Sequence, residues 1–167
     1  MTDLMAAQLA VMQLHARYVD AVWRGDHDTV GDCFAEEGEW RIAGEVIKGR
    51  AAAIAFSKRS QSMTRALLVT LRNPCVNVWN GEITARTYFT AHNFMTDGSV
   101  FTPIGMYYER FVHEREALRF KWRLFQTLYS GGPDYKGDLL EFPDYGPAPA
   151  MPPLDAIPTA KGARGVG

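Results

Sequence analysis

VNVWNGEITARTYF, residues 76–89, places two β-rich runs on either side of Asn80-Gly81. Asn-Gly between runs of β-branched and aromatic residues is the strongest short-range signal for a tight hairpin. On either side of this turn, the two runs extend over Leu67–Trp79 and Glu82–Met95. The sequence therefore predicts two long antiparallel strands joined at Asn80-Gly81.

Toward the C-terminus the same strand-like pattern continues. Asp97-Gly98 indicates a second turn, and Val100–His113 and Leu118–Tyr129 are rich in aromatic and branched residues. We expect four long antiparallel strands in all.

Before the strands, the sequence has helical periodicity. From Leu4 to Arg24, apolar residues recur at steps of three and four, which predicts a helix with Tyr18 facing inward. We expect a short second helix that is capped by Asp26 or Asp28 and ends at Gly38, two short strands in 39–48, and a third helix from Gly49 to about Ser62. Helices followed by a curved sheet predict an α+β fold in which the helices cover the concave face.

The composition is that of an ordinary single domain. The chain has 167 residues, 47% hydrophobic residues and a net charge of −1, which disfavours nucleic acid and membranes as partners. Cys33 and Cys75 have no metal-ligand spacing, so we interpret both as buried thiols in a reducing, cytoplasmic compartment. The domain is expected over residues 1–130, and the Pro/Gly-rich segment 131–167 is expected to pack on it through Tyr135, Phe142 and Tyr145, with its last residues disordered.

The element order and four phrases, ARYVDAVWRGDHDTVGDCFAEEGEW, KGRAA, ITARTYF and FKWRLF, resemble the SnoaL-like branch of the NTF2-like superfamily over roughly residues 5–129. The resemblance implies a cone-shaped fold with a pocket between helices and sheet. Relatives such as scytalone dehydratase and bile acid 7α-dehydratase imply proton-transfer chemistry without a metal or organic cofactor.

Matched residue by residue, this chain departs from the branch. The aspartate of the family's Asp/His dyad falls at Trp23 and the histidine falls near Ala66–Leu67, so the dyad is missing. The resemblance instead places Tyr18, His92, Tyr107 and Glu109 toward the cavity. In this interpretation His92 is the general base or acid, Tyr18 and Tyr107 donate hydrogen bonds, and Glu109 orients His92.

Strand alternation puts Arg86, Tyr88, Thr90 and His92 on one face, and the family register directs that face inward. The expected substrate-binding residues are Trp23, Trp40, Leu67, Arg86, Tyr88 and Phe94. Each site residue also has a structural interpretation: Tyr18 as core, His92 as a sheet-surface histidine, and Glu109 paired across the sheet with Arg86 or Arg123. We expect Asp20 to pair with Arg24 on the surface, and we give His15, His27 and His113 no role.

The sequence thus favours a cofactor-independent lyase, by dehydration or aldehyde-releasing C–C cleavage, or an isomerase. Its expected substrate is a small hydrophobic, hydroxylated, aromatic or polycyclic compound. The alternative is a non-catalytic binding protein or accessory subunit, such as the small subunits of ring-hydroxylating dioxygenases. An apolar outer sheet face with Ile83, Phe89 and Tyr108 predicts a homodimer or homotrimer.

Overall fold

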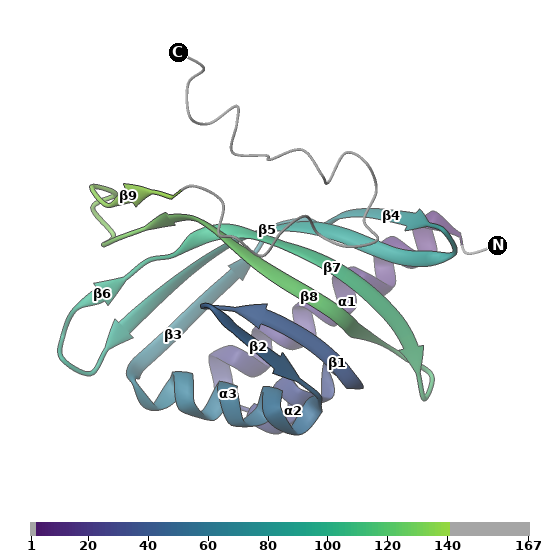
Figure 1. Ribbon diagram of the computed structural model, residues 1–167, viewed down its shortest axis with the longest axis horizontal. Helices are drawn as coiled ribbons and strands as arrows, with labels where there is room; N and C mark the ends of the chain where they lie inside the picture. Colours follow the sequence, from purple (N-terminus) through teal and green to yellow (C-terminus); the bar gives the residue numbers. More distant parts are fainter. Residues whose placement is uncertain (1–2, 141–167) are drawn as a thin grey trace, which may run out of the picture.

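The computed structural model describes residues 3–140 (Figure 1). Three helices precede most of the strands: α1 (Leu4–Arg24), α2 (His27–Asp32) and α3 (Arg50–Ser62). The strands are β1 (Phe34–Ile42), β2 (Glu45–Lys48), β3 (Thr64–Leu71), β4 (Cys75–Trp79), β5 (Glu82–Met95), β6 (Val100–Phe101), β7 (Ile104–Glu114), β8 (Ala117–Ser130) and β9 (Asp138–Leu139). The predicted bounds of the first helix and of the strand at 82–95 are confirmed.

All strands belong to one mixed sheet in the order β2-β1-β8-β7-β5-β3, with β4 and β6 paired to β5 and β9 paired to β8. The β1–β8 pair is parallel and the other pairs are antiparallel. Figure 1 shows the sheet curling around the three helices, which lie on its concave side. The predicted α+β cone is therefore confirmed.

Local chemistry explains the helix ends and the hairpin. The Asp3 carboxylate caps α1 by accepting a hydrogen bond from the Met5 amide at 3.0 Å, and Gly25 ends the helix in the left-handed region. Asn80 and Gly81 both have positive φ, as a tight hairpin turn requires. The pair Asp20–Arg24 forms on the exposed side of α1 as predicted.

Three predicted elements are wrong in their extent. The second helix ends at Asp32 and not at Gly38, because the chain enters β1 and Gly38 packs against the Phe120 carbonyl, where a Cβ would lie 2.8 Å away. The two strands expected over 67–79 and 100–113 are each interrupted, near Pro74 and Pro103. Proline has no N–H to donate to a ladder, so it divides a strand run into two.

Gly105 of β7 lies close against the backbone of β8. A Cβ built on it would lie 2.1 Å from the Gln126 carbonyl oxygen and 2.9 Å from Phe125 Cε2. We expect Gly105→Ala to lower the free energy of unfolding by about 1–3 kcal/mol, because backbone must move to admit the methyl group. Urea unfolding checks this, with Gly132→Ala as control since its nearest neighbour is 3.4 Å away. Equal stability of the two variants would contradict the prediction.

Beyond β8, the chain returns through β9, and the Tyr135 ring packs against the Tyr129 ring with centroids 5.9 Å apart. Phe142, Tyr145 and the expected disordered end lie outside the described residues. Within residues 3–140, no helix is long and apolar enough to cross a membrane.

Candidate active site

A cavity of about 490 Å³ lies between the helices and the concave face of the sheet. Its walls come from all three helices and from β1, β3, β5, β6, β7 and β8, and apolar side chains form most of the lining, including Val22, Val30, Phe56, Val69 and Phe125. The half-buried Ser57, Ser60 and Gln61 of α3 lie on the same lining as the more exposed Met63 and Phe101. The cavity therefore opens between the end of α3 and β6, and closes deep in the cone.

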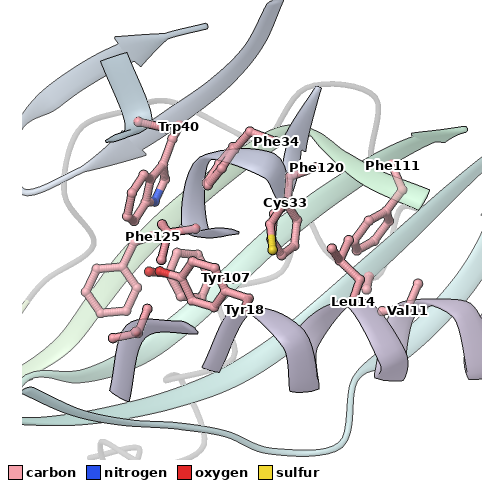
Figure 2. Packing of buried hydrophobic residues seen from close by; sticks show 14 of the residues in the cluster. Val11, Leu14, Tyr18, Cys33, Phe34, Trp40, Tyr107, Phe111, Phe120 and Phe125 are labelled. Carbon is pink, nitrogen blue, oxygen red and sulfur yellow. The ribbon is translucent and has the colours of Figure 1, made fainter. Parts of the chain in front are cut away.

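The closed end carries hydrogen-bond donors. Tyr18 of α1, Trp40 of β1 and Tyr107 of β7 all line the cavity and are at most 4% exposed. Figure 2 shows the hydroxyl ends of the two tyrosines together, with the Trp40 ring beside them; the Tyr18 and Trp40 rings meet edge to face at 6.4 Å. The Trp40 Nε1 is buried without a hydrogen-bond partner among the described residues. A ligand oxygen at this end would give that N–H a partner.

Arg123 of β8 lies directly behind the two tyrosines. Its guanidinium carbon is 3.5 Å from the Tyr107 ring centre and 4.4 Å from the Tyr18 ring centre, and the side chain is fully buried. The Tyr18 hydroxyl interacts with both Arg123 and the Tyr107 hydroxyl. Tyr18 therefore has a fixed positive charge close to its oxygen.

Glu109 of β7 holds this arginine in place. Its Oε1 accepts a hydrogen bond from Arg123 Nε at 2.8 Å, and its Oε2 accepts one from Thr87 Oγ1 at 2.7 Å. His15 Nε2, one turn before Tyr18 on α1, lies 2.9 Å from the same Oε2. Burying charges is costly unless they are paired, and this network pairs Glu109 on every side.

Burial and charge act in opposite directions on these groups. Burial raises the pKa of Tyr18, and the nearby Arg123 offsets only part of that rise. Burial also holds the pKa of Tyr107 well above its usual value. Both hydroxyls are therefore protonated near neutral pH and can act as donors. Burial would raise the pKa of Glu109 too, but the attraction of His15 and Arg123 outweighs it and lowers this pKa to about 2.

Because the pKa of Glu109 is low, the free energy of unfolding should depend on pH in the acidic range. The folded protein binds the proton with a pKa of about 2, against 4.5 for an ordinary glutamate. The carboxylate thus contributes its stability fully above about pH 4.5 and loses it as the pH falls toward 2. We expect the full loss to be roughly 3 kcal/mol, of which about 2 kcal/mol occurs between pH 7 and pH 3. Urea unfolding from pH 7 to pH 3 measures it, and Glu109→Gln should differ less from the wild type as the pH falls. A constant difference would contradict the assignment.

No carboxylate or imidazole lines the cavity among the described residues. Nor does any group of three His, Cys, Asp or Glu side chains within 3–140 have the arrangement of a metal site. The polar groups of the closed end can donate hydrogen bonds to an oxygen, and among the described residues the tyrosine hydroxyls of Tyr18 and Tyr107 are the groups there that could transfer a proton to a ligand.

Of the predicted site residues, Tyr18, Tyr107, Trp40 and Leu67 line the cavity. Glu109 does not line the cavity. It is buried behind the tyrosines, and its partners are Arg123 and His15, not His92. The structural interpretation of Glu109, a pair across the sheet with Arg123, is therefore confirmed. Trp23 lies outside the cavity with 54% of its surface exposed, and its Nε1 donates to the Val69 carbonyl at 2.8 Å.

The predicted inward direction of the His92 face is wrong. Phe89, Ala91, Asn93 and Met95 line the cavity, so the alternate residues Arg86, Tyr88, His92 and Phe94 point to the outer side of β5. There, His92 Nδ1 lies 3.2 Å from Thr102 Oγ1, and Tyr88 packs with Met106, Tyr108, Trp122 and Leu124. The register was taken from relatives, and a shift of one residue exchanges the two faces of a strand. The apolar alternation Ile83, Ala85, Phe89 and Ala91 in the sequence is the signal that favours the observed register.

His15 is the site residue that the sequence interpretation missed, and Arg123 was expected only as one of two possible partners of Glu109. We expected no role for His15, but it is 5% exposed and its ring stacks on Phe120 with centroids 5.9 Å apart. Its position, four residues after Val11 and three before Tyr18, already places it near their stripe. For Arg123 no local pattern exists, because its importance comes from the register that sets it opposite Glu109.

Two further expectations change with the structure. Ile83, Phe89 and Tyr108 are all buried, and Ile83 and Phe89 belong to the inner core, so they form no exposed outer patch. Cys33 is buried, and burial raises the pKa of its thiol to about 11, whereas Cys75 on β4 is exposed. Burial of Cys75 was therefore a wrong prediction.

Solved structures with the same fold include several bacterial proteins. A scytalone dehydratase-like protein of Novosphingobium aromaticivorans has a TM-score of 0.72 at 16% identity, covering 86% of this chain and 96% of that one. Hexachlorocyclohexane dehydrochlorinase LinA-type3 of Novosphingobium barchaimii has a TM-score of 0.70 at 10% identity, covering 82% and 97%. A protein of unknown function from Mycobacterium tuberculosis has a TM-score of 0.64 at 22% identity, covering 71% and 70%.

Identities this low establish a shared fold and leave the chemistry of this chain open. Among curated proteins, no sequence matches this chain significantly. The SnoaL-like domain family matches residues 3–124, the part of the chain that forms the helices and most of the sheet. The chain therefore belongs to the SnoaL-like domain family.

Proposed function

We propose that this protein is a cofactor-independent lyase or isomerase that acts on a small hydrophobic, hydroxylated, aromatic or polycyclic compound. One observation carries the proposal: an apolar cavity of about 490 Å³ closes on the Tyr18 hydroxyl, which has Arg123 behind it. The apolar wall suits a ring system, and the closed end suits its oxygen. The fold shared with dehydratase-like and dehydrochlorinase proteins supports the same class.

In the proposed elimination, Tyr18 acts first as acid and then as base. It gives its phenolic proton to the leaving hydroxyl while the C–O bond breaks, and water departs. The tyrosinate then takes the proton from the adjacent carbon, whose C–H electron pair forms the C=C bond, so that Tyr18 ends protonated again. Arg123 stabilises the transient negative charge, and Tyr107 and Trp40 donate to the substrate oxygen. An isomerisation needs the same group to move one proton between two carbons.

Aldehyde-releasing C–C cleavage would use the same residues with a different first step. A base removes the substrate's hydroxyl proton, the oxygen's electron pair forms the carbonyl as the C–C bond breaks, and the departing carbon keeps the bonding pair and takes a proton back from the base. This route begins with removal of a proton, so it is less suited to a tyrosine whose raised pKa keeps it protonated. Isomerisation that starts by removing a proton from carbon meets the same objection, so we place acid-first elimination ahead of both.

Turnover of hydroxylated aromatic and steroid-like compounds by the purified protein, with no cofactor added, tests this function. Product formation is followed by absorbance and mass spectrometry, which separates loss of water, loss of an aldehyde and isomerisation by mass. Tyr18→Phe should abolish most of the turnover, whereas His92→Ala on the outer side should leave it unchanged. Turnover that survives Tyr18→Phe would remove the proposed mechanism.

A non-catalytic binding protein or accessory subunit is the second candidate. The observation in its favour is that no carboxylate or imidazole lines the cavity among the described residues. In that case calorimetry should detect binding of ring compounds without any product. An accessory subunit should in addition purify with a large partner.

A further inference from the structure

α1 carries a second apolar stripe that faces away from the core. Its residues are Met5, Leu9, Met12, Ala16, Val19 and Trp23. Met5 is 74% exposed, Leu9 67% and Trp23 54%, although each is a large apolar side chain. Most large apolar side chains in a folded domain are covered, so a continuous exposed stripe of them marks a contact surface.

The spacing of this stripe is that of a two-helix seam. Its steps are four, three, four, three and four, the alternation of the first and fourth positions of a heptad repeat. At 100° per residue the six positions lie within one narrow sector, opposite the core stripe of Val11, Leu14 and Tyr18. α1 thus has a second apolar face, which the fold uses only at Val19, which packs partly on the core, and at Trp23, whose Nε1 bonds the Val69 carbonyl.

We propose that the exposed stripe of α1 pairs antiparallel with the same stripe of a second copy of this chain. The stripe is symmetric about Leu14, so a two-fold axis there pairs Met5 with the partner's Trp23, Leu9 with the partner's Val19, and Met12 with the partner's Ala16. Each of these three pairs combines side chains of different size or shape, which lets the two helices approach closely. An isologous contact of this kind closes after two copies and forms a dimer.

Charge also favours the antiparallel direction. The C-terminal end of α1 carries Arg24, and the N-terminal end begins at Asp3. Antiparallel pairing brings Arg24 beside the partner's Asp3, and it sets the negative end of each helix dipole next to the positive end of the other. A parallel pair would instead bring Arg24 next to the partner's Arg24. Gln13, which flanks the stripe near its centre, meets the partner's Gln13 without a charge conflict.

The available surface is sufficient for a weak, reversible dimer. Covering the exposed parts of the stripe on both copies would remove on the order of 1,000 Å² from water, the lower end of specific interfaces. Val19 already packs partly on the core, so the N-terminal half of the stripe contributes more than the C-terminal half. The cavity lies on the opposite side of α1, so this inference does not depend on the proposed function.

Light scattering tests the dimer with single substitutions. At tens of micromolar, the wild type should have twice the 18.7 kDa mass of one chain, and Leu9→Glu should be monomeric. Val46→Glu is the matched control, because Val46 is 51% exposed on β2, away from the stripe, and it should remain a dimer. A wild-type monomer at 100 μM, or an oligomer that Leu9→Glu leaves intact, would overturn the proposal.

Disulfide trapping tests the direction. In a Cys75→Ser background, Gln13→Cys should form a disulfide-linked dimer under mild oxidation, because position 13 lies near the axis. Leu9→Cys should link far less, since antiparallel pairing separates the two copies of position 9 by about 15 Å along the helix. The reverse result would indicate a parallel pair, and no link at either position would indicate no helix contact; both overturn the proposal.

Discussion

Glu109→Ala is expected to lower the free energy of unfolding by about 3–5 kcal/mol. The substitution removes the carboxylate that pairs Arg123 at 2.8 Å, and both side chains have no exposed surface. The guanidinium is then left buried without a counter-charge, and Thr87 and His15 lose their acceptor. Urea unfolding measures the change.

Two controls separate the ion pair from the general cost of truncation. Glu82→Ala removes a half-buried carboxylate that pairs with Arg110 and Lys121, and we expect a loss of about 1 kcal/mol or less. The double variant Glu109→Gln/Arg123→Met replaces both charges by neutral side chains of similar length, so it should be more stable than Glu109→Ala. A loss below 1 kcal/mol for Glu109→Ala would contradict the description of the network.

Tyr18→Phe is expected to reduce turnover of any substrate found in the screen by on the order of 100-fold to 1,000-fold. The variant keeps the ring that packs on Trp40, Phe120 and Arg123 and loses only the hydroxyl. Because the hydroxyl acts on the reacting bonds, the loss should fall in kcat more than in KM. Steady-state kinetics with wild type, Tyr18→Phe and His92→Ala provide the comparison.

Tyr107→Phe refines the interpretation of this result. Tyr107 donates at the closed end but transfers no proton in the proposed mechanism, so its loss should cost less than the loss of Tyr18. If the two variants lose equal activity, the two hydroxyls act as one unit, and the assignment of proton transfer to Tyr18 alone is wrong.

The elements of this fold were largely accessible from local sequence. A helical period over Leu4–Arg24 and a two-residue period on either side of Asn80-Gly81 are properties of neighbouring residues, and the structure confirms both. The strand breaks near Pro74 and Pro103 were missed because the residues on both sides of each proline are β-rich. A proline still ends the pairing there, since it has no N–H to donate to the neighbouring strand.

The site was accessible only in part. Tyr18 could be placed in the cavity because one helix stripe defines its direction. His92 was placed on the wrong side, because the inward face of its strand was taken from relatives and not from the apolar residues on the other face. That choice depends on burying Ile83, Ala85, Phe89 and Ala91 against α1 and the core, a property of the packed domain.

By itself, then, the sequence determined that helices would cover a curved sheet and that Tyr18 would face inward, because short-range periodicity controls both. Local sequence left Arg86 and Arg123 as alternative partners of Glu109, and only the packed domain selects Arg123 and adds His15. These residues come from β7, β8 and α1, and strand register and helix docking bring Arg123 and His15 each within 3 Å of Glu109. Burial then changes their chemistry, because a carboxylate and a guanidinium that would be ordinary surface charges in water become a structural pair next to a reactive hydroxyl.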